Sequence, residues 1–192
     1  MQILTTKFLR SILPQGAQFK IPHHAGADDI VHEVELGVIF NGLGSEHNWM
    51  DRIGAYVLLL DMTDRNHLGK SIKAGTPWLK AKVQDGFLIL GDLIRKEQIA
   101  DPHNMLLELK INGEVRQADN TGNMNFKIDE QVRYLEENGP INFDEGDLLM
   151  SGTPEGIAPV VEGDVLEATL RGPDGALISE IRQVIGRESS PI

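Results

Sequence analysis

Apolar and polar positions along the chain follow a strand-like pattern in several places. Six stretches combine an apolar run or partial alternation with flanking turn residues, as is typical of strands. They are residues 31–40, 55–61, 105–111, 147–151, 164–171 and 177–185. Asn112-Gly113 separates the runs LLELKI and EVRQA, and the sequence GPDG at 172–175 joins the last two stretches. Because these residues favour turns, both positions predict connections between paired strands.

Helical patterns are fewer. Helices are expected at residues 64–74, with Thr63 as N-cap and a stop at Gly75, at 129–138, and at 46–53 as a short element. Strands outnumber helices and do not alternate regularly with them, which favours a β-rich α+β fold over a doubly wound sheet. Without repeats or a break in composition, residues 1–192 are interpreted as a single domain, in which 1–27 form an extension or a truncated start.

Composition excludes several classes of protein. The chain has 192 residues, of which 41% are hydrophobic, and this is enough to bury a core. A net charge of −11 without a dense Lys/Arg run argues against nucleic acid or an anionic membrane as a partner. No apolar run approaches the roughly 20 residues that span a bilayer. The absence of cysteine excludes disulfides and thiolate metal sites.

The first 27 residues contain Lys7, Arg10 and Lys20 but no acidic residue. With apolar residues that would lie on one side of a helix, this segment has the features of a weak organelle-targeting sequence. We favour the alternative of an ordinary strand that enters the domain. The sequence therefore leaves a cytoplasmic and a mitochondrial location open.

The stretch VHEVELGVIF at residues 31–40 sets two carboxylates close together. In a strand, Glu33 and Glu35 point to the same face, together with Val31 and Ile39. Like charges on one face repel each other, so a buried pair needs a cation or a shared proton. A solvated sheet edge and a ligand site both remain open, because E-x-E spacing is common by chance.

Three further features are candidates for chemistry. Asp61 ends the apolar run AYVLLLD and is either a turn or capping residue or a third metal ligand. Three carboxylates suit a hard ion such as Mg²⁺, Mn²⁺ or Ca²⁺. The segment SGTPEGIAP is either a tight turn or an anion-binding loop. Lys80 and Lys82 would share a face in a strand, and sequence chemistry does not choose between them.

Other common site patterns are missing from the sequence. The six histidines have no zinc-binding spacing, so surface, capping or core roles are favoured for each. There is no G-x-S-x-G elbow, no P-loop and no dinucleotide fingerprint. A serine hydrolase and a nucleotide-binding enzyme are therefore disfavoured.

Taken in order, several segments resemble the fumarylacetoacetate hydrolase superfamily, and within it the acylpyruvase and oxaloacetate decarboxylase branch. The matching segments are HEVELGVIF, GAYVLLLDMTDRN, GTPWLKAK, DPHNMLLELKINGEVRQADNTGNM and GDLLMSGTPEGIAPVVEGD. The resemblance extends from about residue 8 onward. It implies a mixed β-sandwich or roll with a few short helices, in a homodimer.

The resemblance also implies a metal-dependent active site. In the family, the two Glu of the H-E-x-E strand and the Asp that ends the next strand hold Mg²⁺ or Mn²⁺. Lys82 would be the catalytic lysine of the family's A-K motif. Arg65, Thr153 and the N–H of Gly152 would bind the substrate, a small 2-oxo acid. In this sequence the implied metal ligands are Glu33, Glu35 and Asp61.

The chain departs from the family pattern in three ways. A segment like R-N-Y-x-x-H-x-x-E, which carries a His/Glu pair on a lid, is not found; either it is missing or it lies upstream of Met1. The motif T-A-R-D has become Thr63-Asp64-Arg65-Asn66, and Val83-Gln84 follows Lys82. The missing His/Glu pair favours oxaloacetate decarboxylation or tautomerisation over 3-acylpyruvate hydrolysis, because neither reaction needs an activated water. The alternative is a catalytically impaired paralogue that binds metal and dicarboxylate without turnover.

Overall fold

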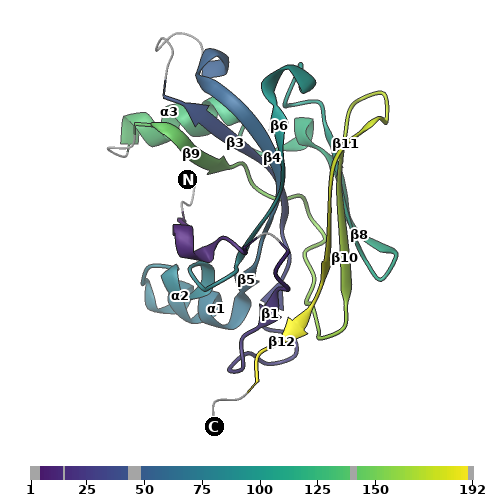
Figure 1. Cartoon of the computed structure of the whole chain (residues 1–192). Helices are drawn as coiled ribbons and strands as arrows, with labels where there is room; N and C mark the ends of the chain where they lie inside the picture. The colour runs from purple at the N-terminus through teal and green to yellow at the C-terminus, as the bar shows by residue number, and fades with distance from the viewer. Residues whose placement is uncertain (1–4, 15, 43–48, 139–141, 190–192) are drawn as a thin grey trace.

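Two four-stranded antiparallel sheets pack face to face in the computed structural model, which describes residues 5–14, 16–42, 49–138 and 142–189 (Figure 1). The first sheet has the order β6-β4-β3-β9 and the second the order β11-β10-β7-β8. Their strands are β3 (Val34–Asn41), β4 (Ile53–Asp61), β6 (Leu88–Arg95), β7 (Leu106–Ile111), β8 (Glu114–Asn120), β9 (Glu145–Met150), β10 (Val165–Arg171) and β11 (Leu177–Val184).

Short elements complete the architecture. β1 (Lys20–Ile21) pairs with β12 (Gly186–Arg187), and β2 (Ile30–Val31) pairs with β5 (Thr63–Asp64). The helices are α1 (Arg65–Ala74), α2 (Leu79–Lys82) and α3 (Ile128–Asn138). Figure 1 shows α1 and α2 beside the end of the first sheet where β4 leads into β5, away from the second sheet. No helix in the described ranges is long and apolar enough to cross a membrane.

The main core lies between the two sheets because alternate side chains of each strand point inward. On β3, Val34, Leu36 and Val38 are fully buried in this core. The residues between them, Glu35, Gly37 and Ile39, therefore point to the outer face of the sheet. This alternation places the carboxylate of Glu35 outside the main core.

The β-rich α+β architecture and the six strands expected from the sequence are confirmed, within three residues at each strand end. The turn at Asn112-Gly113 has φ values of 53° and 84°, as a hairpin of two left-handed residues requires, and it joins β7 to β8. The structure adds β6, which the sequence pattern did not identify. Helix α3 covers the expected segment 129–138.

Several local expectations were wrong. Asp64, not Thr63, is the N-cap of α1, because its side chain accepts a hydrogen bond from the N–H of His67. The expected strand at 31–40 is interrupted after β2, so Glu33 precedes β3. In the N-terminal segment, Leu9–Ser11 form a 3₁₀ turn and Ile12 makes one bridge to Leu88, so the strand expected within residues 1–27 is limited, among the described residues, to β1. Of the expected helix at 46–53, Trp49–Arg52 is a 3₁₀ turn and 46–48 lie outside the described residues.

Candidate metal and active site

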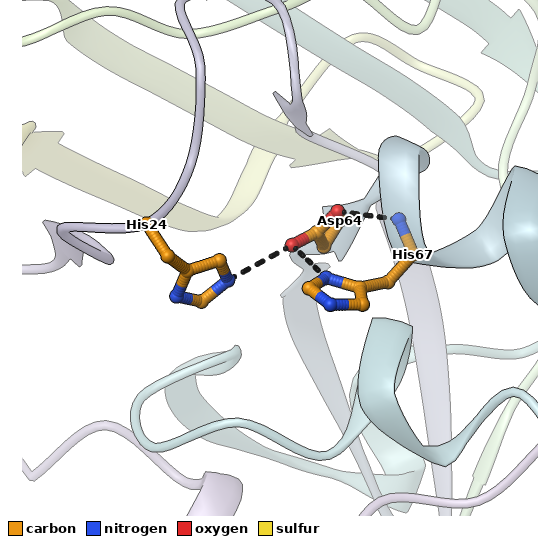
Figure 2. A group of neighbouring side chains, drawn as sticks. All are labelled: His24, Asp64 and His67. Atoms are coloured by element: carbon orange, nitrogen blue, oxygen red, sulfur yellow. Dashed lines mark hydrogen bonds and ion pairs between the residues drawn. The ribbon is translucent and has the colours of Figure 1, made fainter.

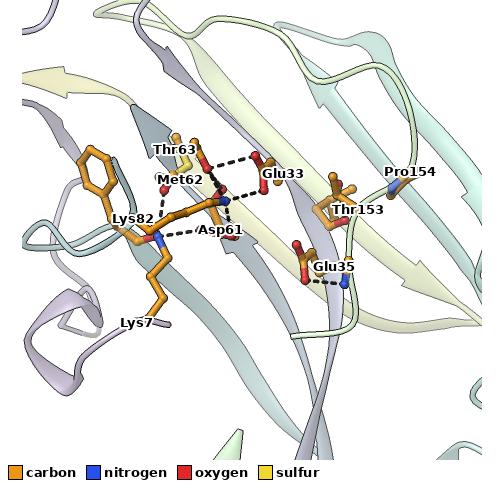
Figure 3. A network of polar contacts seen from close by, with 12 residues as sticks. Lys7, Glu33, Glu35, Asp61, Met62, Thr63, Lys82, Thr153 and Pro154 are labelled. Carbon is orange, nitrogen blue, oxygen red and sulfur yellow. Dashed lines mark hydrogen bonds and ion pairs between the residues drawn. The ribbon is translucent and has the colours of Figure 1, made fainter. Parts of the chain in front are cut away.

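Three carboxylates meet where β3 begins and β4 ends. Glu33, Glu35 and Asp61 each offer an oxygen that lies within 4.8 Å of the other two (Figure 3). The three residues are 9%, 4% and 2% exposed. A buried cluster of like charges is unfavourable without nearby cations, so this arrangement needs positive charge for its stability.

Strand pairing explains why residues far apart in sequence converge. The N–H of Asp61 donates a hydrogen bond to the carbonyl of Glu33 over 2.9 Å, which extends the β3–β4 ladder past the start of β3. Glu35 lies opposite Leu59. Leu59 is two residues before Asp61 on β4, so both point to the outer face of the sheet. All three carboxylates are therefore held by backbone pairing at one end of the sheet.

Lys82 lies at the centre of this cluster. Its ammonium group is 2.8 Å from Glu33 Oε2 and 2.6 Å from Asp61 Oδ2, and it donates to the hydroxyl of Thr63 over 2.6 Å. Lys82 is only 4% exposed, whereas Lys80 is exposed. The expectation that the two lysines share a strand face was wrong: they lie on the four-residue helix α2, which turns only Lys82 inward.

The side chain of Thr63 contacts the carboxylate cluster and does not cap α1. Its hydroxyl donates to Glu33 Oε1 over 3.0 Å while it accepts from Lys82. One hydroxyl thus links a carboxylate to an ammonium group, which fixes the orientation of both.

A second lysine reaches the same carboxylates from the N-terminal segment. The ammonium group of Lys7 is 2.6 Å from Asp61 Oδ1 and donates to the carbonyls of Met62 and Phe87 over 2.8 and 2.7 Å. The contact with Asp61 is a close ion pair without hydrogen-bond geometry, so Oδ1 has no hydrogen-bond donor among the described residues. Sequence reasoning assigned Lys7 only to a basic segment.

The electrostatics of the cluster follow from burial. Burial, with the charges of Asp61 and Glu33, raises the pKa of Glu35 to about 8. Burial also raises the pKa of Glu33, against the opposing effect of Lys82. It lowers the pKa of Lys7 to about 8, although Asp61 opposes this shift. For Lys82, the attraction of Asp61 and Glu33 outweighs burial and raises the pKa, so this group stays charged.

The loop after β9 closes one side of the cluster. The N–H of Gly152 donates to Glu35 Oε2 over 2.8 Å (Figure 3), and the hydroxyl of Thr153 donates to the carbonyl of Val34 over 2.8 Å. A Cβ on Gly156, which has a φ of +97°, would lie 2.0 Å from the carbonyl of Arg116, so only glycine fits this close approach. The loop can follow this path only because glycine is present.

Gln117 on β8 ties this loop to the strand that carries the carboxylates. Its Nε2 donates to the hydroxyl of Thr153 and the carbonyl of Pro154 over 2.8 and 2.7 Å. Its Oε1 accepts from the N–H of Val34 and lies 2.9 Å from Nδ1 of the buried His32. The sequence did not identify Gln117, because a single amide side chain in a strand of the other sheet belongs to no recognisable motif.

Arg65 is not brought to the carboxylates. It is the first residue of α1 and is exposed, and its side chain has no hydrogen bond or ion pair with any residue that the structure describes. Its backbone N–H donates to the carbonyl of Asp29 over 2.7 Å. Asn66 contacts the side chain of Asp29 rather than Arg65.

The cluster fits a divalent cation. It offers three buried carboxylates, which are the ligands that Mg²⁺ and Mn²⁺ prefer. Asp61 Oδ1 has no hydrogen-bond donor in the described part of the chain, and burial together with the charges of Asp61 and Glu33 raises the pKa of Glu35. A cation here would compensate the three negative charges and could take the place of Lys7 at Asp61 Oδ1.

A family model matches this sequence over nearly its whole length. The model, described as fumarylacetoacetate (FAA) hydrolase C-terminal, matches residues 1–185. The chain is 44% identical over 145 residues to "Oxaloacetate tautomerase oaa1, mitochondrial" of Schizosaccharomyces pombe, covering 72% of this chain and 65% of that protein. It is 36% identical over 173 residues to "Oxaloacetate tautomerase FAHD1, mitochondrial" of Homo sapiens, covering 88% of this chain and 76% of that protein.

A solved structure has the same fold. The fumarylpyruvate hydrolase of Pseudomonas aeruginosa, crystallised in complex with Mn²⁺ and pyruvate, superposes with a TM-score of 0.77 at 24% identity. The match covers 90% of this chain and 72% of that protein. At this identity the likeness establishes the fold, and the bound metal and pyruvate are properties of that enzyme.

Proposed function

Since the chain belongs to the fumarylacetoacetate hydrolase family, we propose that it is a divalent-metal-dependent enzyme that interconverts the keto and enol forms of oxaloacetate. The observation that carries the proposal is the convergence of three buried carboxylates with the charged Lys82. Both curated relatives compared above are named oxaloacetate tautomerases. We further propose that residues 1–192 form one domain that acts as a homodimer in mitochondria, the location in both names.

In this proposal Glu33, Glu35 and Asp61 hold Mg²⁺ or Mn²⁺. When bound, the metal supplies a Lewis acid that polarises the keto group of a 2-oxo acid. Glu35 keeps its orientation through the N–H of Gly152, and Glu33 through the hydroxyl of Thr63. The choice of a hard cation rests on three oxygen ligands and the absence of cysteine.

Lys82 is proposed as the catalytic cation. Tautomerisation breaks a C–H bond at C3 of oxaloacetate and forms an O–H bond at C2, so negative charge passes through the C2 oxygen. Because its pKa is raised, Lys82 remains an ammonium group and stabilises that charge. No water has to be activated in this reaction, in contrast to hydrolysis of an acylpyruvate.

Substrate binding is proposed for Thr153 and Arg65, beside the N–H of Gly152, which already donates to Glu35. The hydroxyl of Thr153 is already bonded to Val34 and Gln117, but its backbone N–H has no partner among the described residues. This N–H, close to that of Gly152, is suited to a substrate carboxylate. The exposed guanidinium of Arg65 would receive the second carboxylate, which requires α1 and substrate to approach each other.

The experiment compares three reactions of purified protein: enol–keto conversion of oxaloacetate, its decarboxylation, and cleavage of a 3-acylpyruvate. Each is measured after EDTA treatment and after addition of Mg²⁺ or Mn²⁺. We expect metal-dependent acceleration above the spontaneous rate for enol–keto conversion, and a loss of this acceleration in Glu33→Gln but not in Glu155→Gln, which changes an exposed acid of the nearby loop. Faster decarboxylation or acylpyruvate cleavage than tautomerisation would contradict the assignment.

Two observations favour a second function, a binding protein without turnover. Lys7 occupies Asp61 Oδ1, and Arg65 stands apart from the carboxylates. A catalytically impaired paralogue would bind metal and a dicarboxylate such as oxalate in calorimetry while accelerating none of the three reactions. Any metal-dependent turnover excludes this alternative.

A further inference from the structure

A second group of possible metal ligands lies at the start of α1. His24, Asp64 and His67 each place one nitrogen or oxygen within 4.8 Å of the others (Figure 2). His24 Nε2 is 3.3 Å from Asp64 Oδ2, and His67 Nδ1 is 2.8 Å from the same oxygen. Two imidazoles from different segments therefore meet at one carboxylate oxygen.

The carboxylate at the centre is fixed by secondary structure. Asp64 is fully buried and caps α1 through Oδ1, which accepts from the N–H of His67 over 2.8 Å. His67 is three residues further along the helix, so its ring lies over the cap. Capping needs only Oδ1, and it leaves Oδ2 directed at the two imidazoles.

The histidines are arranged as ligands of a common centre would be. Their rings are 5.3 Å apart with an interplanar angle of 76°, so they do not stack (Figure 2). The side chain of His24 is 41% exposed and that of His67 is 29% exposed, so solvent and ions can reach the group. Gln84 adds a contact with Asp64 Oδ2 from Nε2 over 3.4 Å.

We propose that His24, Asp64 and His67 form a binding site for a borderline transition-metal ion of the Zn²⁺ class, separate from the carboxylate cluster. Neighbouring ligands of tetrahedral Zn²⁺ are about 3.4 Å apart, given bond lengths of about 2.0–2.2 Å. The 3.3 Å distance from His24 Nε2 to Asp64 Oδ2 matches this spacing. The 2.8 Å distance from His67 Nδ1 to the same oxygen has to lengthen slightly when a metal ion replaces the hydrogen bond. Two imidazoles favour this class of ion over Mg²⁺.

The chemistry separates the two sites. Asp61 belongs to an all-carboxylate cluster that suits hard ions, whereas Asp64 is joined by nitrogen ligands. The sequence departs from the motif T-A-R-D at Asp64 itself and from the family pattern again at Gln84, and both departures meet here. A metal at this site would tie the segment that carries His24 to the start of α1, beside Arg65.

Co²⁺ is the probe for this proposal, because its visible absorption reports nitrogen ligands. Protein whose carboxylate cluster is saturated with Mg²⁺ is titrated with Co²⁺ near pH 7.5. We expect one Co²⁺ to bind per chain, at least tenfold more weakly in His24→Ala than in wild type. His23→Ala is the matched control, since His23 is the adjacent exposed histidine and contacts Glu188 instead.

Two comparisons make the result decisive. Glu35→Gln removes a ligand of the other cluster and should leave the affinity of this site for Co²⁺ unchanged. Zn²⁺ should raise the melting temperature of wild type and His23→Ala more than that of His24→Ala, because only an intact site binds the folded state. Equal Co²⁺ affinities in His24→Ala and His23→Ala would overturn the proposal, as would a site lost in Glu35→Gln but retained in His24→Ala.

Discussion

Asp61 and Asp64 are three residues apart, yet they belong to two clusters of opposite character. Around Asp61, two more carboxylates and two lysines are buried, and ion pairs join the lysines to Asp61 and Glu33. Around Asp64, two half-exposed imidazoles share one carboxylate oxygen. The difference arises because Asp61 ends β4 beside the buried Lys82, whereas Asp64, which is also buried, caps α1 and contacts two partly exposed histidines.

The comparison shows how burial determines what each carboxylate requires. A buried cluster of acids must be neutralised by lysines, protons or a cation, so removal of one partner has large consequences. Asp64 is buried, but the N–H of His67 and two partly exposed imidazoles already contact its oxygens, so a metal there adds stability without being required for folding.

The largest effect is expected from Glu35→Gln, which keeps the shape of the side chain but removes its negative charge. Loss of a direct metal ligand should cost more than the roughly 10–100-fold seen for outer-shell partners. We expect metal-dependent oxaloacetate tautomerisation to fall at least about 100-fold. Steady-state kinetics at several Mn²⁺ concentrations measure this, and activity close to that of Glu155→Gln would refute the role of Glu35.

Lys82→Met should be the most destabilising substitution in the metal-free protein. It leaves Glu33 and Asp61 buried without their shared ammonium group, and the loss of one partner of a buried ion pair costs about 3 kcal/mol. Lys80→Met, at the exposed position of the same helix, should change the free energy of unfolding by less than about 0.5 kcal/mol. Urea denaturation in EDTA compares the two, and similar values would show that Lys82 is not an essential counter-ion.

Stability of the metal-free protein should decrease as pH rises. Glu35 has a pKa of about 8 in the folded state against an ordinary 4.5, so the folded state binds more protons between these values. Its contribution is therefore fully present below pH 4.5 and is lost as pH rises through 8. Urea midpoints in EDTA from pH 6 to 8 should fall more steeply for wild type than for Glu35→Gln. Parallel slopes would mean that Glu35 is already ionised in the folded protein.

A smaller and opposite effect is expected at Lys7. Its ammonium group lies on Asp61 Oδ1, which a cation must use, so a metal has to displace it. Lys7→Met should tighten Mn²⁺ binding by roughly tenfold, which corresponds to about 1.4 kcal/mol. Calorimetry measures this, with Lys20→Met as the control at an exposed lysine. Weaker binding in Lys7→Met would show that Lys7 supports the metal site instead.

The sequence predicted the architecture because strand alternation and turn residues are local signals. Glu33, Glu35 and Asp61 could be grouped because they lie in the recognisable motifs H-E-x-E and AYVLLLD. Lys7 could not be found, since it reaches the cluster from a segment without regular structure.

Other parts of the site depend on tertiary contacts. Helix α2 has four residues, which is too short to show a helical period, so the orientation of Lys82 had no sequence signal. Gln117 joins the site from the second sheet through sheet packing alone. His24 and His67 are 43 positions apart in number and show no ligand spacing, and only the fold brings them to Asp64.

The central claim is that the buried carboxylate cluster binds a divalent metal. Anomalous diffraction at the manganese absorption edge, from crystals soaked in Mn²⁺, tests it directly. The account predicts one strong peak among Glu33, Glu35 and Asp61, with the ammonium group of Lys7 moved away from Asp61. Density for Lys7 that remains on Asp61, without an anomalous peak between the three carboxylates, would contradict it.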